Sequence, residues 1–101
     1  MILVLTTTDK ISLAKKISKS LLKQKLVACV SIIPMESSYW WRGKIVNSKE
    51  YQVILKTKSA NFTKIERAIK KLHNYDLPEV ISVDIQKANK GYLTWIDKEI
   101  S

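Results

Sequence analysis

The 101-residue sequence contains few of the residues on which several special classes of protein depend. With one cysteine, Cys29, it can form no internal disulfide, which excludes a disulfide-rich secreted scaffold. With one histidine, His73, it cannot build a zinc finger or an HExxH metalloprotease motif. Two glycines and two prolines exclude collagen-like and linker-like sequences. The reducing cytoplasm is therefore the compartment that we expect.

Long hydrophobic runs are also missing. No apolar run approaches the ~20 residues of a membrane-spanning helix, so we expect no membrane crossing. Met1 is followed directly by residues 2–5, Ile-Leu-Val-Leu, which predict a strand and not a signal peptide. The chain is 46% apolar and 27% charged, a composition typical of one folded domain, here residues 1–101.

Acidic residues are scarce relative to basic ones, 9 against 18, which gives a net charge of +9. All the basic residues except Arg42 and Arg67 are lysines, and they are scattered along the chain. Specific nucleic-acid recognition more often uses clustered arginines. The pattern therefore favours solvated helix faces over a nucleic-acid partner.

Hydrophobic periodicity predicts alternating strands and helices. Phe62, Ile65, Ile69 and Leu72 form the clearest helical stripe, after a cap at Ser59 or Asn61. A first helix is expected over about residues 10–25, capped by Thr8 or Asp9, and a last one over 89–100 with Tyr92, Leu93, Ile96 and Ile100 inward. Strands are expected over 2–5, over 26–33 and 38–45 with an interruption at Pro34, over 50–58 and over 79–85.

This order predicts an α+β fold of the ferredoxin-like β-α-β-β-α-β type, an antiparallel sheet with an added C-terminal helix. A long central hairpin is expected, with its turn at residues 46–49. Tyr39, Trp40 and Trp41 lie where the hairpin extends beyond the helices, and adjacent side chains on a strand point to opposite faces. Because a monomer would expose these rings, we expect them at the interface of a homo-oligomer, for which composition alone favours a dimer.

Five segments, in one order along the whole chain, resemble the CutA family of divalent-cation tolerance proteins. They are Lys-Leu-Val-Ala-Cys-Val-Ser-Ile-Ile-Pro at 25–34, Ser-Tyr-Trp-Trp-Arg-Gly-Lys-Ile at 38–45, Ile-Leu-Lys-Thr at 54–57, His-Asn-Tyr-Asp-Leu-Pro-Glu-Val-Ile at 73–81 and Tyr-Leu-Thr-Trp-Ile at 92–96. The resemblance implies a homotrimer with an architecture like that of the PII signalling proteins, which replaces the dimer. It also implies a role in tolerance of copper and other divalent metals, and no enzymatic activity.

The chain departs from the family pattern at several positions. Met35 stands where many members have glycine, and Arg42 where they have a carboxylate. Thr6 aligns near a cysteine that is implicated in copper binding in some bacterial members. Leu72-His73 replaces a pair of histidines found in some members. Two of three soft metal ligands are therefore absent.

His73 is the main candidate metal ligand, because imidazole suits copper, nickel and zinc. Asp76 and Glu79 are close in sequence and could supply oxygen, so we expect these three residues to bind a divalent metal weakly at a subunit boundary. Alternatively, His73 stabilises the helix C-terminus. Cys29 could add a thiolate, although a buried free cysteine more often packs as a small hydrophobe.

Two other functions stay open. One is a PII-like signalling or small-ligand-binding module. The other is a basic RNA-associated domain, because RNA-binding sheets of the same plan stack bases on aromatic side chains. Residues 50–58 offer only Tyr51 for such stacking, and the sequence contains no recognisable catalytic set.

Overall fold

A computed structural model describes residues 1–100. The elements follow the order β1, α1, β2, β3, α2, β4 and α3, with a short 3₁₀ turn before α2. The strands form one antiparallel sheet in the order β2-β3-β1-β4. Their bounds are Ile2–Thr8 for β1, Ile11–Lys23 for α1, Cys29–Trp41 for β2, Lys44–Thr57 for β3, Ser59–Asn61 for the 3₁₀ turn, Phe62–Leu72 for α2, Ile81–Asp84 for β4 and Lys90–Glu99 for α3.

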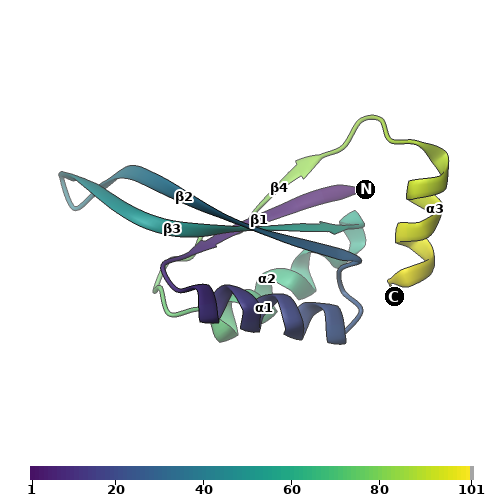
Figure 1. Cartoon of the computed structure of the whole chain (residues 1–101), viewed down its shortest axis with the longest axis horizontal. Helices are drawn as coiled ribbons and strands as arrows, with labels where there is room; N and C mark the ends of the chain where they lie inside the picture. Colours follow the sequence, from purple (N-terminus) through teal and green to yellow (C-terminus); the bar gives the residue numbers. More distant parts are fainter. Residues whose placement is uncertain (101) are drawn as a thin grey trace.

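The two longer helices, α1 and α2, cover one face of the sheet, while α3 lies at the end away from the hairpin tip (Figure 1). At that end the Nζ of Lys56 on β3 lies 3.3 Å from the hydroxyl of Tyr92 on α3. The β2–β3 hairpin extends well beyond the helices, which gives the molecule extents of 45 × 26 × 22 Å (Figure 1). None of the helices within residues 1–100 is long and apolar enough to cross a membrane.

The core lies between the sheet and the helices α1 and α2. Alternate residues of β1 and β3 are fully buried there, as the two-residue period of a strand requires. They meet the helical stripe formed by Ile65 and Ile69, both inaccessible to solvent, with Phe62 and Leu72 packed against its edge. The predicted stripe is therefore confirmed.

The other face of the sheet has no such cover, and we call it the open face. Ile33 on β2 and Ile81 and Val83 on β4 belong to it and remain 45–47% exposed. The register places the even-numbered residues of β3 on the same face, because Ile33 pairs with Gln52. A single chain therefore leaves an apolar sheet surface in contact with water.

The predicted turn of the hairpin is wrong. Residues 46–49 lie within β3, and the chain reverses at Arg42-Gly43 between the paired residues Trp41 and Lys44. Both turn residues have positive φ, +50° and +77°, as a two-residue turn of the type I′ class requires. The polar segment 46–49 remains extended because it pairs with β2 where no core demands alternation.

The predicted interruption at Pro34 is also wrong. β2 is continuous, and Pro34 keeps its register opposite Tyr51. Proline lacks a backbone N–H, which makes it costly in a central strand but acceptable at an edge. Because β2 is an edge strand, its outer side needs no hydrogen bond. The strand itself begins at Cys29, later than predicted.

The helix ends depart from the predicted caps. Lys10 occupies the N-cap of α1, and its N–H lies 3.4 Å from the Thr8 hydroxyl. Asn61 occupies the N-cap position of α2, as predicted, but its side chain makes no capping hydrogen bond; its amide donates to the carbonyl of Leu26, which also accepts from Thr57.

The last two elements are shorter than predicted. β4 covers residues 81–84, and α3 covers residues 90–99. Ile96 and Ile100 point inward as predicted, whereas Leu93 remains 36% exposed. The prediction that Leu93 points inward is therefore wrong, because α3 covers only one end of the sheet.

Candidate functional site

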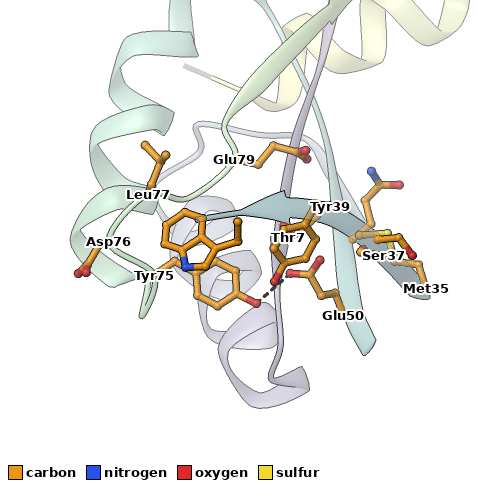
Figure 2. Close-up of a pocket in the computed structure, with 12 residues that line it drawn as sticks. Thr7, Met35, Ser37, Tyr39, Glu50, Tyr75, Asp76, Leu77 and Glu79 are labelled. Carbon is orange, nitrogen blue, oxygen red and sulfur yellow. Dashed lines mark hydrogen bonds between the residues drawn. The ribbon is translucent and has the colours of Figure 1, made fainter. Parts of the chain in front are cut away.

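A pocket of about 560 Å³ lies on the open face, where the hairpin leaves the body of the sheet. Its floor comes from β1, β2 and β3, and the segment between α2 and β4 closes one side (Figure 2). Its lining contains three carboxylates and no lysine, arginine or histidine, although the whole chain has a charge of +9. The lining residues are Thr7, Met35, Ser37, Ser38, Tyr39, Trp41, Glu50, Gln52, Tyr75, Asp76, Leu77 and Glu79.

Glu50 is the most deeply placed charged group of the pocket. It lies on β3 opposite Met35, and it is only 6% exposed. One carboxylate oxygen accepts a 2.8 Å hydrogen bond from the hydroxyl of Tyr75 (Figure 2). Within residues 1–100 no basic side chain forms an ion pair with it, since the one such pair there joins Lys70 and Glu66. A buried carboxylate is normally paired with a cation or a metal, so Glu50 marks a place for positive charge.

Tyr75 is held in place by His73. The backbone N–H of Tyr75 donates to His73 Nδ1 at 3.0 Å, and His73 Nε2 lies 2.6 Å from the carbonyl oxygen of Thr7. Because a carbonyl oxygen can only accept a hydrogen bond, Nε2 carries the proton. Nδ1 accepts from the N–H of Tyr75 and carries none, so the imidazole is neutral in this arrangement. Burial, reinforced by the hydrogen bond to Glu50, raises the pKa of Tyr75 above the ordinary phenol range. The phenol therefore stays protonated and donates to Glu50.

Glu79 and Asp76 differ in their position at the pocket. Desolvation raises the pKa of Glu79 above its ordinary value, and the negative charge of Glu50 adds to this effect. Glu79 keeps contact with solvent, so it can still exchange protons or ligands. Asp76 is exposed and points away from Glu50 and Tyr75 (Figure 2). The carboxylates that influence each other are therefore Glu50 and Glu79.

The structure does not bring the four predicted metal ligands together. Glu79 and Asp76 line the pocket, but both ring nitrogens of His73 are already hydrogen-bonded. Cys29 is a half-buried free cysteine opposite Lys56, four residues along β3 from the pocket residue Gln52. No group of three or more His, Cys, Asp or Glu side chains within residues 1–100 could hold a metal ion. Within residues 1–100 the four predicted residues do not form one ligand group, and their role in metal binding remains a prediction.

The three aromatic residues of the hairpin divide between its two faces. Tyr39 and Trp41 line the pocket and are 41% and 47% exposed. Trp40, between them, points to the opposite face, where it pairs with Ile45; these two are 72% and 62% exposed. All three are expected from the sequence at a subunit interface, and in the structure Tyr39 and Trp41 form a wall of the pocket.

Sequence reasoning missed Glu50, the central group of the site. One signal was available, because Glu50 is the only acidic residue of β3 and alternates with core residues. Its importance depends on Tyr75, which is 25 residues away in sequence. No local pattern predicts that contact.

Comparison with known proteins identifies the family. The family model for the CutA1 divalent ion tolerance protein matches residues 2–99. A protein from Pyrococcus horikoshii named divalent-cation tolerance protein CutA is 40% identical over 99 residues, which is 98% of this chain and 97% of that protein.

Solved structures agree with this match. A crystal structure of CutA1 from Pyrococcus horikoshii has a TM-score of 0.95 at 39% identity, and the match covers 100% of this chain and 99% of that one. A structure from Archaeoglobus fulgidus, described as the periplasmic divalent cation tolerance protein CutA, has a TM-score of 0.97 at 35% identity and full coverage of both chains. The chain belongs to the CutA1 divalent ion tolerance family.

Proposed function

We propose that the protein acts in divalent-cation tolerance by binding a divalent cation at the oxygen ligands of the pocket, with Glu50 and Glu79 as the principal carboxylates. The observation that carries this proposal is Glu50, a residue that is only 6% exposed and forms no ion pair within residues 1–100. A bound cation would supply the missing positive charge.

The mutual influence of the two carboxylates supports the same site. Desolvation raises the pKa of Glu79, and the charge of Glu50 raises it further, so the two negative charges repel each other across the pocket. A divalent cation between them would reverse this repulsion, as a proton does in part. Some cations are bound by only one or two protein carboxylates and keep several waters. Within residues 1–100 no third acidic or imidazole side chain joins Glu50 and Glu79 in one ligand group, and such a cation does not require one.

The available ligands favour a hard cation. Carboxylate, hydroxyl and amide oxygens suit magnesium, calcium and manganese, whereas copper prefers imidazole and thiolate. His73 could bind copper only by giving up one of its two hydrogen bonds, and Cys29 lies outside the pocket. Weak copper binding, with His73, Asp76, Glu79 and Cys29 as ligands, remains a prediction that titration can test.

We further propose that the chain forms a homotrimer of ferredoxin-like subunits. The open face lacks helical cover, and Trp40 with Ile45 adds an exposed apolar pair at the hairpin tip. Burial of such apolar surface favours association by about 25 cal/mol for each Å² removed from water. A PII-like module that binds a small ligand is the second candidate, favoured by the pocket volume of about 560 Å³. The cytoplasmic location remains a prediction from the single cysteine.

The direct test is calorimetric titration of the metal-free protein with Mn²⁺, Mg²⁺ and Cu²⁺. We expect Glu50→Gln to weaken Mn²⁺ binding at least about tenfold, since it removes the buried charge. Glu36→Gln is the matched control, because Glu36 is an exposed hairpin carboxylate outside the pocket lining. Equal Mn²⁺ affinity in the wild type and in Glu50→Gln would refute the proposed site.

A further inference from the structure

Binding of an inorganic cation leaves the aromatic wall of the pocket unexplained. Tyr39, Trp41 and Tyr75 all line a pocket whose volume of about 560 Å³ is that of a site for a small organic molecule. Within residues 1–100 neither Tyr39 nor Trp41 makes a ring–ring contact with another aromatic side chain. Neither ring is therefore packed against another aromatic side chain of the same chain, and both border the pocket.

The charge of the pocket restricts what that molecule can be. The lining contains three carboxylates and no basic group, and its deepest charge, Glu50, has one oxygen bound by Tyr75 and no cationic partner in the described chain. An anion would be repelled, and a neutral molecule would leave that buried charge uncompensated. Aromatic faces attract organic cations through the negative potential of the ring. The buried Glu50 and the aromatic wall therefore favour the same kind of ligand, an organic cation.

We propose that this pocket binds a small organic cation, with its ammonium or guanidinium group against Glu50 and its carbon body between Tyr39 and Trp41. The inference rests on the proposed function only in using Glu50 as the anionic group. The free oxygen of Glu50 accepts from the N–H donors of the ligand, while Tyr75 donates to the other oxygen. Ser37 and Gln52 provide further polar contacts in the lining.

The hairpin already contains an example of this interaction. The guanidinium carbon of Arg42 lies 5.5 Å from the centre of the Trp41 ring, although Arg42 is not part of the pocket lining. A cation of the same chemistry is thus accommodated by the Trp41 ring within the chain itself. Arg42 does not reach Glu50 in an ion pair, so the buried charge remains for the ligand.

The test measures binding of n-butylguanidinium and n-butylammonium, with n-butanol as the uncharged probe of similar shape, by calorimetry on the full chain in its native oligomeric state. We expect both cations to bind and butanol to bind at least about tenfold more weakly, because it lacks the charge. Glu50→Gln and Trp41→Leu should each weaken butylguanidinium binding at least about tenfold. Trp95→Leu is the matched control, since Trp95 is an exposed tryptophan of α3 outside the pocket lining and should leave the affinity unchanged.

The outcomes separate this inference from the proposed function. If Mn²⁺ binds in a Glu50-dependent manner and neither organic cation binds, the inference is wrong and the proposed function stands. If the organic cations bind and no divalent metal does, the inference stands and the metal site is wrong. Equal binding of butanol and butylammonium would overturn the inference by showing an apolar pocket only. Trp41→Leu keeps the test decisive if Glu50→Gln fails to fold, because Trp41 is an exposed hairpin residue and contributes nothing to the core.

Discussion

The hydrogen bond from Tyr75 to Glu50 should make a large contribution to stability. The two oxygens are 2.8 Å apart, and the acceptor is a carboxylate that is only 6% exposed. Replacing Tyr75 with phenylalanine removes the hydroxyl that donates to Glu50 and keeps the ring, so the cost is that of leaving a buried charge without this partner. Hydrogen bonds to charged groups contribute about 1.5–3 kcal/mol, so we expect a loss of about 2 kcal/mol.

Urea denaturation at one fixed protein concentration measures this loss, because oligomer dissociation makes the apparent stability depend on concentration. For m values of about 1–3 kcal/mol/M, the midpoint should fall by roughly 1 M. Tyr39→Phe is the control, because Tyr39 lines the same pocket and the substitution removes the same atom. Tyr39 is 41% exposed, and its hydroxyl makes no hydrogen bond within residues 1–100. Equal midpoints for the two variants would refute the reasoning.

A double-mutant cycle gives the same argument a second, independent test. In a Glu50→Gln background the buried group is neutral, so Tyr75→Phe should cost less than it does in the wild type. A cost that is unchanged by Glu50→Gln would mean that Tyr75 stabilises the fold through packing of its ring and not through this hydrogen bond.

Further predictions concern single positions. Thr6 has a fully buried hydroxyl without a hydrogen-bond partner in the described chain, so Thr6→Val should stabilise the protein by about 1 kcal/mol in urea denaturation. Gly43→Ala should destabilise it by about 1 kcal/mol, because φ is +77° there and space is not limiting. His73→Ala should cost about 2 kcal/mol in urea denaturation by breaking the link between Thr7 and Tyr75. Because the pKa of Tyr75 is raised in the folded state, the contribution of Tyr75 to the free energy of folding is complete below about pH 10 and is lost as the pH rises further. Absorbance at 295 nm of the metal-free protein should therefore show one tyrosine that ionises after the others.

Periodicity predicted the parts of the fold that a core determines. The stripe on α2 and the alternation along β3 follow directly from which side chains are buried against each other. The largest errors concern the hairpin, where no core exists. Pro34 is harmless because β2 lies at an edge, and Arg42-Gly43 forms the turn because a two-residue reversal needs positive φ. Strand order and turn conformation are properties of the assembled sheet that a local window of sequence does not contain.

The candidate site was predictable only in part for a similar reason. Asp76 and Glu79 were found because they are neighbours in sequence, and Asp76 then proved to point away from the buried carboxylate (Figure 2). Glu50 was missed because its environment is created by Tyr75, which follows α2 in the sequence and reaches Glu50 on β3 only in the folded chain. A charge acquires an unusual role through what surrounds it, and these surroundings come from the tertiary fold.

The positions of the soft ligands explain why the structure favours oxygen chemistry. Thr6 and Leu72 stand where the resemblance to the family leads us to expect soft ligands. Thr6 is completely buried beside the core, and Leu72 packs against that same core. His73 uses both ring nitrogens to fix the Tyr75 segment to β1. The residues from which a copper site would be built therefore hold the fold together, while the oxygens of Glu50 and Glu79 remain facing a pocket. Glu50 is the group common to both, because the hydrogen bond from Tyr75 to Glu50 stabilises the fold while the Glu50 side chain lines the pocket. The stability of Glu50→Gln is therefore measured beside its cation affinity, so that a lost site is distinguished from a lost fold.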